Sequence, residues 1–170
     1  MTVKKDPRRQ LLGAQAHAKG KWFENRLDRS FTYYRENAIA AVEKTPEPMK
    51  PIRSMGKGQF VAIYEKKAQP DYKGVMRGGQ EVVMEAKYTD TDRIQQDRVG
   101  EVQSVYLNLH ETLGAMCFII CGFSSGKVYR VPWRVWQTMK SRFGHKYVTE
   151  TDIKRYEVQH TANGTLLILD

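Results

Sequence analysis

Hydrophobic side chains recur at helical spacing in the first third of the chain. From residue 23 the intervals between them are four, four, three and four, which is the pattern of one buried face of an amphipathic helix. The residues of this face are Phe23, Leu27, Phe31, Tyr34 and Ala38. We therefore predict a helix over residues 21–41. Residues 1–19 are basic and lack this periodicity, so we expect them to form a flexible basic arm.

Apolar runs of strand type follow in the middle of the chain. Residues 60–66, 71–76 and 80–87 have strand patterns, and Arg77-Gly78-Gly79 turns the chain between the last two. A second helix, which ends near Gly114, is predicted from Ile94, Val102, Val105, Tyr106 and Leu109. A buried strand over 115–123 follows, with 127–131 as its hairpin partner, and Pro132 begins a third helix. The tail contains one more possible helix around Asp152 and a short apolar strand, 166–169. This order predicts a single mixed α/β domain over residues 20–170, with a central sheet flanked by helices.

Residues 45–59 interrupt this order with a stretch rich in proline and glycine. Pro46, Pro48, Pro51, Gly56 and Gly58 exclude a helix and disfavour a strand. We therefore predict a long loop here. Loops of this length in a compact domain are usually mobile or functional.

Composition narrows the possible partners and the compartment. The chain of 170 residues has 28 Lys and Arg against 19 Asp and Glu, a formal charge of +9, which favours an anionic partner such as nucleic acid. An apolar content of 41% excludes wholesale disorder. No apolar run is long enough for a membrane span, and no secretory signal begins the chain. Cys117 and Cys121 share one predicted strand and cannot bridge each other, so we expect a reducing compartment, the cytoplasm.

Candidate chemistry lies in the second and third predicted strands. Side chains alternate along a strand, so Glu85 and Lys87 share one face, about 6.6 Å apart along the chain. Asp71 lies on the hairpin partner, roughly across from both. Two carboxylates and an amine that converge in this way suit Mg²⁺, which retains waters and takes oxygen ligands. The alternative is a salt-bridged, solvent-facing strand pair, because Glu-x-Lys on its own is a weak motif.

The convergence of these residues depends on strand register. A strict two-residue turn at Gly78-Gly79 would pair Tyr72 with Glu85 and would direct Asp71 to the opposite face. A site therefore requires an odd-length loop or a bulge between Asp71 and Glu85, and we predict one.

Other polar and aromatic residues admit two interpretations. Glu24 either compensates the dipole at the start of the first helix or contributes to a site. Gln103 is a surface amide or a buried hydrogen-bonding one. Trp133 and Trp136 could stack on bases, although helical spacing favours core packing for Trp136. The four histidines lack metal-ligand spacing, and no P-loop, nucleophile elbow or dinucleotide-binding loop is present.

Taken in order, these motifs resemble a known family. They are Gly20-x-x-Phe23-Glu24, Pro46 and Pro48, Asp71-Tyr72-x-Gly74-Val75, Glu85-Ala86-Lys87 with Thr89, Gln103-x-x-x-Leu107, Cys117-Phe118-Ile119 and Tyr129-x-Val131-Pro132. From about Gly20 to Val158 their order is similar to that of the RecU-type Holliday junction resolvases, members of the PD-(D/E)xK nuclease superfamily. Each motif is loose, but their collinearity is specific.

The resemblance implies a fold, a site and an activity. The fold would be restriction-endonuclease-like, with residues 45–59 as a stalk that projects into the junction centre. Asp71, Glu85 and Glu24 would ligate Mg²⁺, for which Mn²⁺ would substitute, and Lys87 would assist the attacking water. Gln103 would support the site. The DNA-binding residues would be Lys50, Arg53, Lys57, Lys73 and Arg77.

The expected activity is symmetric, metal-dependent cleavage of four-way junction DNA by a homodimer, without a nucleotide cofactor or a membrane. The products would carry a 5′-phosphate. Two other functions stay open at this point: a duplex or flap endonuclease of the same fold, and a non-catalytic basic DNA-binding recombination mediator. The stalk is shorter than in the bacterial members and Met84 stands where the family usually has Phe. These departures are compatible with a divergent, phage-borne version.

Overall fold

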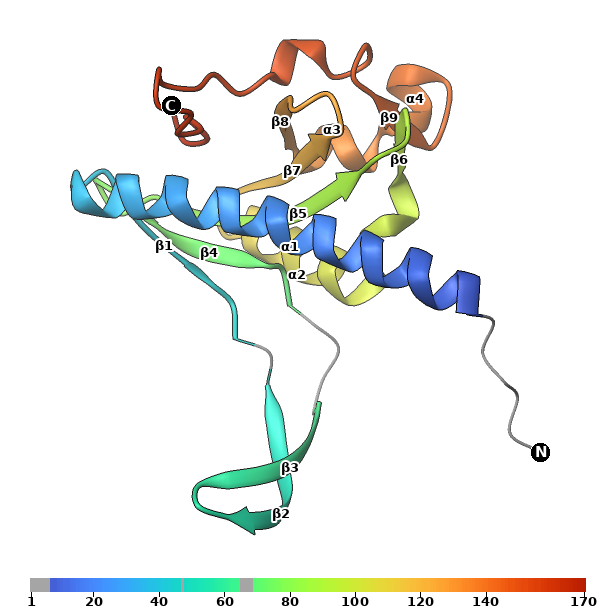
Figure 1. Cartoon of the computed structure of the whole chain (residues 1–170). Helices are drawn as coiled ribbons and strands as arrows, with labels where there is room; N and C mark the ends of the chain where they lie inside the picture. The colour runs from blue at the N-terminus through green and yellow to red at the C-terminus, as the bar shows by residue number, and fades with distance from the viewer. Residues whose placement is uncertain (1–6, 47, 65–68) are drawn as a thin grey trace.

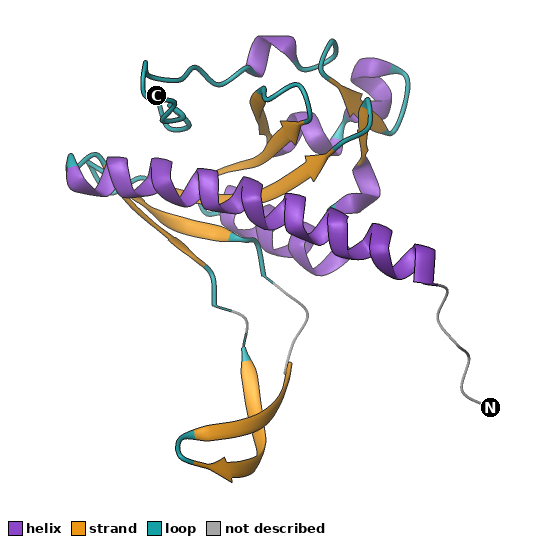
Figure 2. Ribbon diagram, in the orientation of Figure 1, coloured by secondary structure: helices purple, strands orange, loops and turns teal. Residues whose placement is uncertain are grey.

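A five-stranded mixed sheet separates two layers of helices (Figures 1 and 2). The structure, a computed structural model, describes residues 7–46, 48–64 and 69–170. The strand order is β1-β4-β5-β7-β8, in which β5 and β7 are parallel and the other neighbours are antiparallel. The strands are β1 (Ala40–Lys44), β4 (Tyr72–Met76), β5 (Glu81–Thr89), β7 (Met116–Phe123) and β8 (Val128–Pro132). The predicted mixed α/β fold with a helix-flanked central sheet is confirmed.

Helix α1 (Pro7–Glu36) covers one face of the sheet, and its predicted apolar residues are buried except Ala38, which is exposed and lies beyond the helix. The helix packs on Val82, Met84, Phe118 and Ile120 of the central strands. The helices α2 (Glu101–Thr112), α3 (Trp133–Gln137) and α4 (Met139–Phe143) lie on the other face. Alternation along β5 thus sends even-numbered side chains toward α1 and odd-numbered ones toward α2.

The ends of α1 differ from the prediction. Residues 7–19, expected as a flexible arm, continue the helix toward the N-terminus. Proline is favourable in the first turn and this segment is rich in good helix formers, while Lys19 forms an ion pair with Asp90 beyond β5. Residues 1–6 of the expected arm lie outside the described residues. At its other end the helix stops at Glu36, before residue 41, because Ala38 adopts a positive φ of 52° and the chain enters β1.

The loop between β4 and β5 has an odd number of residues, as a site that contains Asp71 and Glu85 requires. Tyr72 pairs with Met84, and the Met76 N–H donates to the Gln80 carbonyl. The loop between them therefore consists of three residues, Arg77, Gly78 and Gly79, and both glycines have positive φ. The prediction of an odd-length loop is confirmed. Asp71 consequently lies opposite Glu85 rather than opposite Ala86.

Residues 45–59 are not a simple loop, and this prediction is wrong. Strands β2 (Met49–Gly56) and β3 (Gln59–Tyr64) pair as an antiparallel hairpin, the stalk hairpin, which projects from the body of the molecule (Figure 1). Proline is tolerated at Pro51 because a two-stranded hairpin leaves one edge of each strand unpaired, and the register shifts there. The strand predicted over 60–66 belongs to this hairpin and not to the central sheet. Residues 65 and 66 lie outside the described residues.

Smaller elements complete the α2 side of the sheet. They are the strands β6 (Arg93–Gln95) and β9 (Tyr147–Thr149), which pair with each other, and the 3₁₀ turns η1 (Gln96–Arg98) and η2 (Lys154–Tyr156). The predicted start of the second helix at Ile94 is therefore wrong, because Ile94 lies in β6 and α2 begins at Glu101. The predicted β7–β8 hairpin is present. The strand expected over 166–169 is reduced to one bridge between His160 and Leu166. Cys117 and Cys121 are both buried, free thiols in β7. None of the described helices is both long and apolar enough to cross a membrane.

Candidate active site

Asp71 and Glu85 meet where β4 and β5 separate. The Asp71 N–H donates to Glu85 Oε2 at 3.1 Å, and the Ala86 N–H donates to Asp71 Oδ2 at 2.9 Å. Each of the two carboxylates therefore accepts a hydrogen bond from a backbone N–H on the opposite side, as a main-chain carbonyl does between paired strands. This exchange fixes both carboxylates at the end of the sheet.

Glu85 is the most enclosed charged group of the site, with only 1% of its surface exposed. It forms an ion pair with Lys87, two residues along the same face of β5, and accepts a bond from Gln103 Nε2 at 2.6 Å. Burial raises the pKa of Glu85 to about 7, against the opposing effect of Lys87, and the charge of Asp71 raises it further. Burial also raises the pKa of Asp71, opposed by its bond from the Ala86 N–H and by Lys87.

Gln103 reaches the site from the first turn of α2. Its Oε1 accepts the Gly100 N–H at 3.0 Å while its Nε2 donates to Glu85. One amide thus closes the N-terminus of the helix and holds the buried carboxylate. Of the two interpretations of Gln103, the structure supports the hydrogen-bonding amide, which is half-buried, whereas the neighbouring Val102 is exposed.

Glu24 approaches the same place from α1. Its carboxylate forms an ion pair with Lys44, the last residue of β1, and this hydrogen bond raises the pKa of Lys44. The Tyr72 hydroxyl donates to Asp28 Oδ1 at 2.8 Å, and the Glu24 carbonyl oxygen lies 3.3 Å from the same hydroxyl. These contacts anchor α1 to β4 next to the site. Lys44 was missed in the sequence because β1 itself was not recognised.

One pocket of about 330 Å³ gathers these groups. Its lining includes Glu24, Asp71, Glu85, Lys87 and Gln103. Among the residues that the structure describes, no three Asp, Glu, His or Cys side chains are already arranged as a metal site. The donor set nevertheless suits a hard divalent cation, because it consists of carboxylate oxygens. Burial raises the pKa of both Asp71 and Glu85, and a divalent cation bound between them would favour their ionised forms.

Comparison with known proteins places the chain in a family. The family model described as "Recombination protein U" (RecU) matches residues 18–169. The chain belongs to the RecU family. A curated relative, "Holliday junction resolvase RecU" of Geobacillus sp. (strain WCH70), is 26% identical over 154 residues, which cover 81% of this chain and 73% of the relative. A solved structure of Hjc, a Holliday junction resolvase from Archaeoglobus fulgidus, aligns with a TM-score of 0.47 and 14% identity over 77% of this chain and 92% of that one.

A larger hollow of about 660 Å³ adjoins the site and shares Glu24 and Asp71 with it. Its lining also carries three potentially cationic side chains, His17, Lys21 and Lys44. Thr45 also lines it, and the Thr45 N–H donates to the Asp71 carbonyl at 2.8 Å. The Thr45 hydroxyl is buried without a hydrogen-bond partner among the described residues, so it is available to a polar ligand group.

The basic residues predicted to contact DNA fall into two groups. Lys50, Arg53 and Lys57 lie exposed on the stalk hairpin of this RecU-family chain, among exposed apolar side chains of the same strands. Lys73 Nζ instead donates to Gln69 Oε1 and to the Tyr106 hydroxyl on the α2 side of β4. Arg77 lies at the far end of β4, where it donates to the carbonyls of Asn37 and Ala38. The last two side chains therefore already have protein partners.

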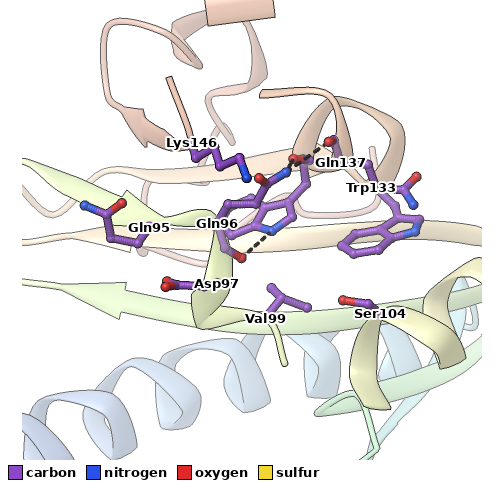
Figure 3. A pocket seen from close by; sticks show the side chains of 9 residues that line it. Gln95, Gln96, Asp97, Val99, Ser104, Trp133, Gln137 and Lys146 are labelled. Atoms are coloured by element: carbon purple, nitrogen blue, oxygen red, sulfur yellow. Dashed lines mark hydrogen bonds between the residues drawn. The ribbon is translucent and has the colours of Figure 1, made fainter. Parts of the chain in front are cut away.

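A separate hollow of about 590 Å³ lies between η1, α2 and α3 (Figure 3). The Trp136 indole N–H donates to the Gln96 carbonyl at 3.2 Å, and Gln96 Nε2 donates back to the Trp136 carbonyl at 2.7 Å (Figure 3). Trp133 donates to Asn108 Oδ1. Both indoles are at most 2% exposed. They are core residues, as favoured for Trp136, and are not surfaces for base stacking.

Proposed function

We propose that this RecU-family chain is a Holliday junction resolvase, a homodimeric endonuclease that cuts two opposed strands of four-way junction DNA. The observation that carries the proposal is the convergence of Asp71, Glu85 and Lys87 at one end of the sheet. The relative from Geobacillus is itself described as a Holliday junction resolvase, which supports the same substrate. A homodimer supplies one site for each of two cuts, and its two-fold symmetry matches that of the paired cuts.

Asp71, Glu85 and Glu24 are the residues that would hold Mg²⁺, with Mn²⁺ as a substitute. The cation would lower the pKa of a bound water and offset charge on the scissile phosphate. Within the chain, Gln103 holds Glu85 in the direction of the pocket. Lys87, whose side chain is 14% exposed, carries its amine beside the place where the phosphate is attacked and stabilises the developing negative charge. Water is the nucleophile and the 3′ oxygen is the leaving group, which takes up a proton, so the products are a 5′-phosphate and a 3′-hydroxyl.

The path of the DNA is proposed from charge. The adjoining hollow with Lys21, Lys44 and the Thr45 hydroxyl takes the backbone phosphates that flank the cut. The stalk hairpin enters the open centre of the junction, where Lys50, Arg53 and Lys57 contact phosphates and the exposed apolar side chains contact unstacked bases. Binding is therefore expected to weaken steeply with salt.

One assay tests the function. Purified protein is incubated with Mg²⁺, Mn²⁺ or EDTA and with labelled substrates of three kinds: a mobile four-way junction, a linear duplex and a flap. Asp71→Asn is the inactive variant, because asparagine keeps the oxygen that accepts the Ala86 N–H and removes the charge. Asp97→Asn, at an exposed carboxylate of η1, is the matched control.

We expect symmetric nicks in the junction with either metal, none in EDTA, and a loss of at least about 100-fold in Asp71→Asn but not in Asp97→Asn. Equal cutting of the linear duplex or the flap would identify a less selective nuclease. Tight junction binding without cleavage in either metal would contradict catalysis and point to a DNA-binding mediator.

A further inference from the structure

Trp22 is a tryptophan that the fold leaves open to solvent. Half of its surface (50%) is exposed, whereas Trp133 and Trp136 are at most 2% exposed. Tryptophan is on average highly buried in folded proteins, because its side chain is large and mostly apolar. The helix that carries it is held firmly, since the adjacent Phe23 and Leu27, one turn further on, are buried in the core. A well-anchored helix therefore presents an indole that core packing does not use.

The indole stands at the rim of the candidate active site. Its ring contacts the ring of Tyr88 edge-on, with 6.2 Å between the centroids and 75° between the planes. Tyr88 directly follows Lys87 along β5, and both line the pocket of about 330 Å³. Trp22 is two residues from Glu24, a rotation of about 200° around the helix, so the two side chains leave α1 on different flanks. The larger hollow shares Glu24 with the site pocket but is not lined by Tyr88. Tyr88 and Trp22 therefore bound the site on the side away from that hollow.

Cations share the flank of α1 that carries Trp22. Lys19 lies three residues before it, and Arg26 and Arg29 lie four and seven residues after it, so the four side chains form one stripe, the α1 stripe. Lys19 pairs with Asp90, whereas Arg26 donates to a carbonyl of the β7–β8 turn, a neutral group that leaves its charge uncompensated. Arg29 is exposed, and the described part of the chain offers it no acidic partner within ion-pair distance. An aromatic ring among cations suits single-stranded nucleic acid, because the ring stacks on a base and the cations contact phosphates.

We propose that Trp22 stacks on a nucleobase of the strand that is cut, beside the scissile phosphate, and that the α1 stripe holds the flanking phosphates. This inference rests on the proposed function and adds a contact to its site. An indole can reach the face of a base only where the base lacks a stacked neighbour, as at the branch point of an open four-way junction. Within an intact duplex the stack must first be broken. Trp22 therefore favours cutting at the branch over cutting in a linear arm.

Tryptophan fluorescence tests the contact directly, because Trp22 is the exposed one of the chain's three tryptophans. Trp22→Phe removes its emission and leaves that of Trp133 and Trp136, so the difference between the two chains is the signal of Trp22. A four-way junction or a linear duplex of equal length is added in EDTA, where cleavage is not expected. Emission and its quenching by acrylamide are measured for the free protein and at saturation with each DNA.

Binding by variants supplies the second measurement. Trp22→Leu keeps an apolar side chain and removes the aromatic face, whereas Trp22→Phe keeps an aromatic face. Asn25→Ala, at an exposed residue of the same helix outside the α1 stripe, is the matched control. Circular dichroism checks that each variant is folded. If Trp22→Leu proves unfolded, the fluorescence comparison still decides, since it uses the unmodified chain and Trp22→Phe.

We expect the saturating junction to lower the Trp22 emission at least about two-fold and its acrylamide quenching constant at least about three-fold, and the linear duplex to change neither. The dissociation constant for the junction should rise at least about five-fold in Trp22→Leu, less in Trp22→Phe and not in Asn25→Ala. An unchanged Trp22 signal at saturation with the junction would overturn the proposal. An equal response to linear duplex would overturn the contact with a branch-point base. A Trp22 signal that shifts with protein concentration in the absence of DNA would place the indole in a protein contact and would also overturn it.

Cleavage assays separate this inference from the proposed function. A quenched Trp22 in a chain that cuts no DNA would refute the nuclease and leave the base contact standing. Junction cleavage by a chain whose Trp22 is not quenched would do the reverse. With both in place, Trp22→Leu should reduce the preference for junction over linear duplex in cleavage at least about five-fold, and Trp22→Phe should retain most of it. An unchanged preference in Trp22→Leu would contradict the role of Trp22 in selecting the branch.

Discussion

The buried carboxylate Glu85 makes the stability of the metal-free protein dependent on pH in a direction that can be measured. Its pKa rises from an ordinary value of 4.5 to about 7 in the folded chain, chiefly through burial. Between these values the folded state binds more protons than the unfolded state, so the free energy of unfolding falls as pH rises. The stabilising contribution is complete below pH 4.5 and is lost as the pH passes 7.

Glu85→Gln removes this titration and retains the shape of the side chain. At about 1.4 kcal/mol per pH unit, the rise in pKa corresponds to about 3 kcal/mol. The attraction of Lys87 acts only on the ionised carboxylate and is therefore already included in this pKa. We therefore expect the stability difference, Glu85→Gln minus the unmodified chain, to increase by about 3 kcal/mol between about pH 4.5 and 8. For a chain of this size that is roughly 6–12 °C in Tm.

Urea and thermal unfolding in EDTA at about pH 4.5, 6, 7 and 8 measure this difference. Glu43→Gln, at an exposed carboxylate of β1, is the control and should give a flat profile against the unmodified chain. At about pH 7.5, Mg²⁺ should raise the Tm of the unmodified chain and not that of Glu85→Gln, because the cation favours the ionised carboxylate. A difference that stays constant with pH, or that shrinks as pH rises, would refute the assignment of Glu85 as a destabilised buried acid.

Three further outcomes are expected. Gly74→Ala should destabilise the fold by about 3 kcal/mol or more in urea unfolding, because its Cβ would lie 2.1 Å from the backbone carbonyl oxygen of Ala41; Gly13→Ala, with nothing within 4 Å, should be neutral or slightly stabilising. Lys44→Gln should reduce the slope of log K against log salt for junction binding by about one, and an unchanged slope would remove Lys44 from the DNA path. Arg53→Gln on the stalk hairpin should weaken junction binding several-fold while leaving affinity for linear duplex nearly unchanged, as a gel-shift titration of both substrates can show.

The parts of the fold that could be predicted are those in which one strong periodicity acts alone. The four-residue spacing of Phe23, Leu27 and Phe31 indicated the buried side of α1, and the apolar run before Phe123 indicated β7. Alternation along a strand placed Glu85 and Lys87 on one face, whereas the position of Asp71 followed only from the odd-length loop that a site requires.

The errors arose where tertiary contacts override local preference. Ala40 and Ala41 continue a helical pattern, yet they form β1 because pairing with β4 outweighs propensity. Pro51 argued against a strand, but the stalk hairpin needs hydrogen bonds from only one edge. Lys44 could not be found without β1. The ion pair with Glu24 joins residues 20 positions apart, and no local pattern indicates such a contact.

The Arg77-Gly78-Gly79 loop must keep an odd number of residues if Asp71 is to stay on the same face as Glu85. The register of β5 is set by its long pairing with β7, so a gain or loss of one residue in this loop must be absorbed by β4. Every β4 side chain would then change face, and Asp71 would point toward α1. An insertion of a single residue far from the chemistry would thus inactivate the nuclease with all of its acidic groups intact, whereas changes of two residues would spare it. Length variation here is therefore expected to be tolerated in even steps alone.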